Sequence, residues 1–187
     1  GIFQLIEEKT DMFYVLEAVN IAAVLLMLSM LVVVIRQQPS RAQMAFVLYD
    51  VFTVIFVIGV QLELMHADTV GEALSGLCVQ YVGQAGFLMA LLWFASEFAY
   101  LKIPGWIYII QAAINTVVLV GVFTAEHHPY FYNSMKILND GMYHRINVSG
   151  GIIWEIHYVH MAAVLLTIQI CCGVRYRQST ACLLYTS

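Results

Sequence analysis

The chain contains five long runs of apolar residues, each long enough to cross a lipid bilayer as a helix. A transmembrane helix needs about 20 mostly apolar residues, and such runs occupy residues 14–35, 42–65, 73–101, 106–124 and 152–174. Segments inside a bilayer must satisfy their own backbone hydrogen bonds, which favours helices. Only 11% of the residues are charged, against about 25% in soluble domains. We therefore predict an all-α fold, a polytopic transmembrane helical bundle. The lipid bilayer in which it is embedded is the first partner we expect.

The connections between these runs divide the positive charges unequally. Short polar segments join the first four runs, and a long polar connection at 125–151 precedes the last. Cytoplasmic loops carry an excess of Lys and Arg, so the side with more of them is expected to be inside. That rule predicts an N-terminus outside, and the net charge of −4 gives no reason to expect a nucleic-acid partner. The richer side holds Arg36, Arg41, Lys102, Arg175 and Arg177, and the other holds Lys9, Lys136 and Arg145.

The two ends of the sequence look different from the centre. Residues 1–13 are mixed in character and are predicted to form an extracytoplasmic lead-in, while residues 14–177 form the transmembrane domain. Residues 182–187 resemble the translation of a sequencing-library adapter, so we expect them to be a foreign scar outside the fold.

Two polar residues share one face of the second predicted helix. Gln61 follows Asp50 by eleven positions, and eleven steps of about 100° return close to the same side of a helix. Polar groups in a membrane helix are costly and usually face the protein interior. They either fix helix packing through interhelical hydrogen bonds or take part in binding a ligand or an ion.

A second polar group is expected where the second and third helices meet. If these helices form an antiparallel hairpin, Glu63 would meet Gln80 and Gln84, which are four residues apart and share a face. Tyr81 adds a phenol beside them. The group is either a polar cap at the membrane surface or a ligand-binding pocket.

The remaining polar residues predict no chemistry. His157 and His160 share a helix face, but no tight metal signature accompanies them, and packing explains them as well. Glu97 is expected to reach the membrane surface or to pair with Lys102. Because no nucleophile–base set or phosphate-binding loop is present, we expect no catalytic residue, no metal, no cofactor and no enzymatic activity in this chain.

Several short motifs occur in a recognisable order. They are Leu62-Glu63-Leu64, the segments VQYVG at 79–83 and FASEF at 94–98, EHHPYFY at 126–132, and WEIHY at 154–158. Together they resemble the N-terminal seven-helix sensor region of bacterial histidine kinases, a module that also precedes diguanylate cyclase domains. The resemblance implies a bacterial inner membrane location, five spans present of seven, a missing cytoplasmic kinase or cyclase domain, and a homodimer formed through that domain.

Two classes of function remain. The first is a sensory input module that passes an extracytoplasmic or membrane signal, such as an unknown small molecule, to a cytoplasmic effector. The second is a small transporter or channel that uses Asp50, Gln61 and Glu63 as a path. Transporters often show inverted repeats and helices broken at mid-membrane, and the sequence shows neither, so the sensor is favoured.

Overall fold

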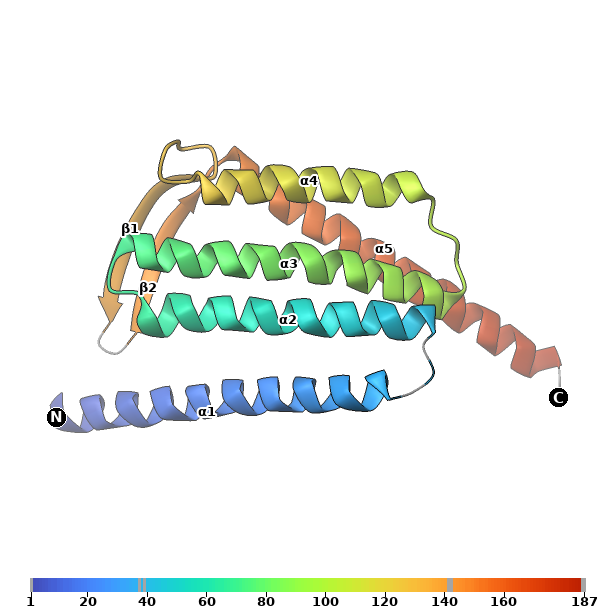
Figure 1. The fold of residues 1–187 in the computed structure, drawn as a ribbon, viewed down its shortest axis with the longest axis horizontal. Helices are drawn as coiled ribbons and strands as arrows, with labels where there is room; N and C mark the ends of the chain where they lie inside the picture. Colours follow the sequence, from blue (N-terminus) through green and yellow to red (C-terminus); the bar gives the residue numbers. More distant parts are fainter. Residues whose placement is uncertain (1, 37, 39, 141–142, 186–187) are drawn as a thin grey trace.

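Five long helices make up most of the molecule (Figure 1). The computed structural model of the chain describes residues 2–36, 38, 40–140 and 143–185. Within these residues each helix contains a segment long and apolar enough to cross a membrane. The predicted five-span helical bundle is therefore confirmed. The helices are α1 (Ile2–Ile35), α2 (Arg41–His66), α3 (Val70–Ala99), α4 (Gly105–Phe123) and α5 (Ile152–Tyr185).

Helices α2 and α3 begin where side chains cap their first turn. The Gln43 amide donates to Ser40 Oγ at 3.1 Å, and the Ser40 amide donates to the Gln43 side chain at 2.8 Å. Thr69 and Glu72 repeat this reciprocal arrangement at the start of α3. Because the first amides of a helix have no intrahelical partner, such pairs fix where a helix starts. Helix α3 ends at Tyr100, whose φ of 56° is typical of a helix C-terminus.

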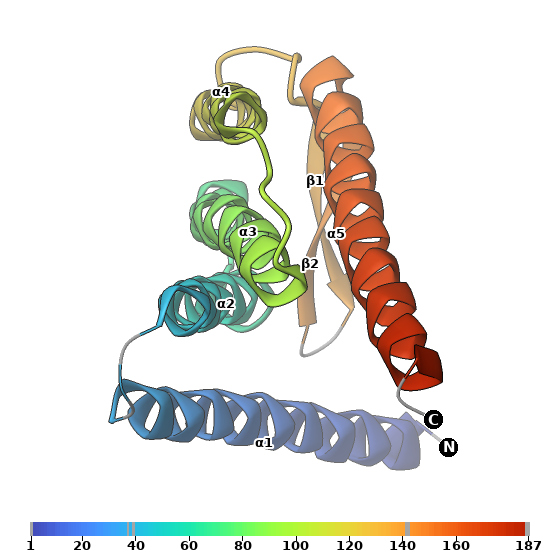
Figure 2. The ribbon, with the colours of Figure 1, turned by 90° about the vertical axis from the view of Figure 1, so that its right-hand side faces the viewer.

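Helix α3 lies at the centre of the bundle. In Figure 2, where α2, α3 and α4 are seen nearly end-on, α2, α4 and α5 lie around α3, and all three contact it. The contact with α2 is a close approach of two backbones. A Cβ at Gly83 would lie 2.4 Å from the Phe56 nitrogen, and one at Gly76 would lie 2.6 Å from the Glu63 nitrogen. Small residues allow membrane helices to pack this closely, so α2 and α3 form a tight antiparallel pair.

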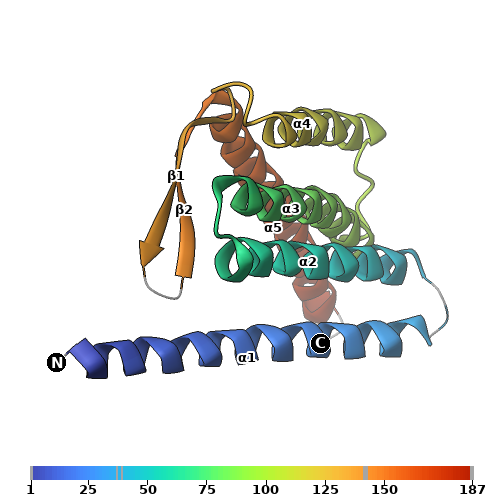
Figure 3. The ribbon, with the colours of Figure 1, turned by 60° about the vertical axis from the view of Figure 1, so that its left-hand side comes forward.

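Helix α1 lies at the edge of the bundle, on the α2 side (Figure 3). None of the residues in its membrane-length segment, Glu17–Ile35, is buried. The helix runs without a break from Ile2, so the predicted lead-in continues directly into the first span. At the other end of the chain α5 continues to Tyr185. Residue 1, and residues 186–187 of the predicted scar, lie outside the described residues.

The connection between α4 and α5 contains a β-hairpin, although the sequence analysis predicted only a polar connection there. Strands β1 (Tyr132–Asp140) and β2 (Tyr143–Gly150) pair in antiparallel fashion. Met135 lies opposite Val148, and Ile137 lies opposite Ile146. These apolar residues recur at every second position, the period that places side chains on one face of a strand. Ile146 is buried against α3 and α4, so the hairpin packs on the bundle through that face.

The two ends of the bundle differ. The end where α1 joins α2 and α3 joins α4 carries Arg36, Arg41 and Lys102, and we call it the arginine end. The opposite end, where the hairpin packs, is called the hairpin end (Figure 1). Toward the arginine end α3 and α5 meet through apolar side chains, including Leu92, Val164 and Cys171. At the hairpin end a larger cluster joins α3, α4 and the hairpin, with Leu77, Val122 and Phe131 buried in it.

Candidate functional site

Glu63 and Gln80 meet between α2 and α3, as the sequence suggested. The Gln80 amide donates a hydrogen bond to Glu63 Oε2, and it also donates to the Gly59 carbonyl at 3.4 Å. A Cβ at Gly59 would lie 2.4 Å from the Gln80 nitrogen, so the two backbones are in close contact at this level. The pair therefore links two helices that already pack tightly, and it does so near the hairpin end.

The other predicted residues of α2 lie apart from this pair. Gln61 lines a cavity of about 330 Å³ together with Glu17 and Asn20 of α1. Asp50 is buried, with only 5% of its surface exposed, and its Oδ2 has no hydrogen-bond partner among the described residues. The six residues predicted as one site are thus distributed over several interfaces.

Tyr81 makes its contacts with the hairpin and with α5. Its ring packs edge-on against Phe131, with 5.1 Å between ring centroids, and lies 5.2 Å from the ring of His157. The Tyr132 hydroxyl donates to the Tyr81 hydroxyl at 3.4 Å. Burial, with Tyr81 beside it, raises the pKa of Tyr132 above its usual value, so this phenol stays protonated and can donate. Tyr81 therefore joins α3 to the hairpin and to α5.

Gln84 also faces α5 and does not join Glu63. Its amide contacts the sulfur of Met161, one residue after His160. The expectation that Gln80 and Gln84 act together rested on their shared helix face. Although Gln80 and Gln84 lie one turn apart on α3, Gln80 bonds to α2 and Gln84 contacts α5.

Four buried polar side chains lie where α4 and α5 pack on α3, and we call them the polar interface. All four are at least nine-tenths buried, and each has a nitrogen or oxygen without a partner among the described residues. Buried polar groups are normally hydrogen-bonded, because an unmet hydrogen bond costs about 1–3 kcal/mol. The polar interface consists of Gln111 and Asn115 of α4 and His157 and His160 of α5.

Contacts with α3 place this polar interface on one side of the bundle. Asn115 donates to the Ala85 carbonyl at 3.2 Å, and Gln111 lies one turn away on the same face of α4. The His157 ring lies beside Tyr81, and 6.4 Å separates the centroids of the His157 and His160 rings. Along α3, these polar side chains lie between the apolar cluster at the hairpin end and the apolar contact with α5 toward the arginine end.

From the sequence, the two histidines were candidates for metal binding, whereas Gln111 and Asn115 were not singled out. The spacing of four between Gln111 and Asn115 within the apolar fourth run places both on one helix face, which was the signal available. Among the described residues no group of three His, Cys, Asp or Glu side chains is close enough to hold a metal ion.

The hairpin is joined to the start of α5 through the backbone. The Gly151 amide donates to the Phe131 carbonyl at 2.8 Å, and the Ile153 amide donates to the Tyr130 carbonyl at 3.0 Å. A Cβ at Gly151 would lie 2.4 Å from the Tyr130 oxygen, so this position accepts only glycine without movement. Strand β2 therefore leads directly into a helix of 34 residues that is held to the beginning of β1.

Comparison with known proteins identifies the type of molecule. A family model described as the N-terminal 7TM region of histidine kinase matches residues 18–185. The chain belongs to this family. No curated protein and no solved structure matches it. The family description counts seven spans, and the described part of this 7TM region holds five membrane-length helices.

Membership agrees with the resemblance that the motifs indicated. The matched range includes the polar interface, the hairpin and all six predicted site residues. As a 7TM region of histidine kinases, the chain is a membrane-embedded part of a signalling protein. The match does not assign a ligand or a role to any residue.

Proposed function

We propose that this 7TM region receives a signal at the hairpin end and passes it along α5 to a cytoplasmic histidine kinase or diguanylate cyclase. The observation that carries the proposal is the polar interface: four buried polar side chains, one of them beside Tyr81, each have a polar atom without a hydrogen-bond partner among the described residues. Polar groups that burden stability in this way are typical of functional sites. A small molecule able to donate and accept hydrogen bonds, arriving from outside the cell or from the membrane, is the class of signal that these groups suit.

The interface is placed where binding would move α5. His157 and His160 belong to α5; the His157 ring lies beside Tyr81 of α3, and Asn115 of α4 donates to the α3 carbonyl at Ala85. A ligand shifts a packing equilibrium only by its difference in affinity for the two arrangements. A coupling of about 1–3 kcal/mol is enough for regulation, and one or two additional buried hydrogen bonds supply that amount.

The other predicted residues have supporting roles in this proposal. The Glu63–Gln80 pair holds α2 against α3, so that α5 can move relative to a fixed pair of helices. Asp50 and Gln61 of α2 do not join this pair, and in this proposal they adjust how α2 packs. The cytoplasmic effector would bring two copies together as a homodimer, and the N-terminus would lie outside.

The test uses the full-length signalling protein in lipid nanodiscs, with effector activity measured across a panel of small polar compounds. Gln111→Leu removes an amide whose two polar atoms both lack a hydrogen-bond partner among the described residues. We expect this variant to be more stable and to respond several-fold less to the active compound, because it removes both the unmet hydrogen bonds and the contact with the ligand. Tyr81→Phe should weaken the response in the same direction.

Thr116→Val is the matched control, because Thr116 is exposed on α4 and its hydroxyl donates to the carbonyl of its own helix at Ala112. Its response should be unchanged. A full response from both Gln111→Leu and Tyr81→Phe would refute the polar interface as the signal site. Solute flux through liposomes containing the protein would instead support the transporter alternative.

A further inference from the structure

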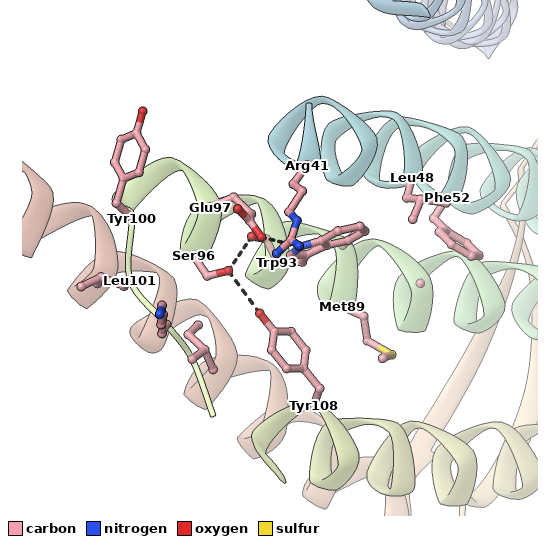
Figure 4. A pocket seen from close by; sticks show the side chains of 14 residues that line it. Arg41, Leu48, Phe52, Met89, Trp93, Ser96, Glu97, Tyr100, Leu101 and Tyr108 are labelled. Carbon is pink, nitrogen blue, oxygen red and sulfur yellow. Dashed lines mark hydrogen bonds between the residues drawn. The ribbon is translucent and has the colours of Figure 1, made fainter. Parts of the chain in front are cut away.

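A second region of the molecule lies at the arginine end. A cavity of about 900 Å³ opens between α2, α3 and α4 (Figure 4). This volume is at the upper end of what ligand sites offer, about 300–1,000 Å³. We call it the arginine-end groove. The residues that α3 contributes lie three and four positions apart on one face, and they include Gly86, Ala90, Trp93 and Glu97.

On α3 the groove uses a different face from the one that packs on α5, and it borders the α5 contacts at Leu101, Ile103 and Tyr108. Leu88 and Leu92, which pack against Val164 of α5, follow Gly86 and Ala90 by two positions, or about 200° around the helix. The groove therefore lies on another side of α3, where α2 and α4 form its walls. Where no other helix covers it, this side of a membrane-spanning bundle meets lipid.

The mouth of the groove is positively charged. Arg41 of α2 and Lys102 of the α3–α4 connection both line it, and neither has an ion-pair partner among the described residues. Figure 4 shows the Arg41 side chain extending over the groove toward Trp93 and Glu97. Helix α4 begins beside Lys102 without a side-chain cap, and the free amides of a first turn add positive potential.

The one carboxylate in the groove is already engaged. The Trp93 indole donates to Glu97 Oε1 at 3.2 Å, whereas Glu97 was expected to reach the surface or to pair with Lys102. Deeper in the groove the polar pair Ser96 and Tyr108 lies within 3.3 Å. Two cations against one hydrogen-bonded carboxylate leave the mouth with a net positive charge.

We propose that the arginine-end groove binds one anionic phospholipid from the adjacent leaflet. Its phosphate lies at the mouth, near Arg41 and Lys102, and one acyl chain fills the apolar part between Leu48, Phe52 and Met89. Basic pockets between transmembrane helices are known to take anionic lipid headgroups. The combination of a charged mouth and an apolar interior fits a lipid better than a free anion or an uncharged hydrophobic molecule.

The contact between Tyr100 and Arg175 would connect a bound lipid to α5. Tyr100 lines the groove, and the Arg175 guanidinium of α5 lies 4.8 Å from the centroid of its ring. A cation over an aromatic face is attracted to it. Lipid at the mouth would compete with Tyr100 for Arg175 or reinforce the contact, so lipid composition would affect the position of α5.

The test uses the protein in nanodiscs with Trp93 as its single tryptophan, Trp106 and Trp154 being replaced by Phe. Brominated phosphatidylglycerol and brominated phosphatidylcholine quench tryptophan fluorescence on contact, which gives the relative affinity of each lipid at the groove. We expect phosphatidylglycerol to be preferred. Arg41→Gln and Lys102→Gln should each reduce this preference about fivefold.

Two further variants distinguish binding at the arginine-end groove from a general attraction of anionic lipid to positive charge. Arg36→Gln removes a cation at the same end that does not line the groove, and it should leave the preference unchanged. Met89→Trp, made with Trp93→Phe, should fill the apolar part and lose the preference while the thermal midpoint in detergent stays the same. Equal quenching by both lipids, an equal loss in Arg36→Gln, or protection of Trp93 from both lipids in the full-length protein would overturn the proposal.

Discussion

The tight contact between α2 and α3 can be tested with a single methyl group. In Gly83→Ala the new Cβ would lie 2.4, 2.7 and 2.8 Å from three backbone atoms of α2, the nitrogen and Cα of Phe56 and the oxygen of Phe52. An ordinary contact begins at 3.4 Å, so the helices must separate by about 1 Å (3.4 − 2.4) at this level. Backbone atoms cannot move aside as a side chain can, and a gap of about 0.5–1 Å loses a quarter to a half of the dispersion energy along the contact.

The expected loss follows from two opposing effects. Overpacking costs about 1–3 kcal/mol, and backbone contacts favour the upper end of that range. Alanine gains about 0.8–1.0 kcal/mol over glycine inside a helix. The free energy of unfolding of Gly83→Ala should therefore fall by about 2 kcal/mol.

Gly173→Ala is the matched control, because Gly173 lies inside α5 and its Cβ would meet nothing within 4 Å. This variant keeps the gain in helix propensity without the clash. Denaturation by SDS in mild detergent, followed by circular dichroism, measures both variants. If Gly83→Ala were as stable as Gly173→Ala, the close approach of α2 and α3 would be incorrect.

Two further predictions concern orientation and the buried carboxylate of α2. With single cysteines placed at Gln38 and at Ser134 in a background without native cysteines, an impermeant reagent applied to intact cells should label only the second, because the arginine end is expected inside; the opposite pattern would reverse the topology. Asp50→Leu should raise the thermal midpoint in detergent, because it removes a buried oxygen that has no partner among the described residues. It should also change the response to signal in the full-length protein. A higher midpoint with an unchanged response would leave Asp50 without a functional role.

Helix positions were predictable because the membrane restricts the alternatives. Apolar runs of bilayer length gave all five helices, with bounds close to those observed for α2 and α4. The pairing of Glu63 with Gln80 also followed, since two antiparallel helices joined by a short turn must bring their adjoining ends together. These features depend only on local sequence and on neighbouring helices.

The hairpin and the polar interface were harder to predict for a physical reason. The hairpin is short and polar on one side, although alternating apolar residues and the dipeptide Asp140-Gly141 were sequence signals for it. The polar interface brings α4 and α5 to the same helix: Asn115 donates to α3 at Ala85 and His157 lies beside Tyr81, so the interface depends on how α4 and α5 pack against α3. Periodicity identifies the inward face of a helix but not which other helix that face will meet.

The joint between the hairpin and α5 restricts the sequence in an unusual way. It consists of main-chain hydrogen bonds from Gly151 and Ile153 and of close contacts that require glycine at position 151. Main-chain groups are the same in every residue, so substitutions elsewhere in the hairpin leave the joint intact. The outward residues of the hairpin can therefore diversify while the connection between β2 and α5 is inherited unchanged.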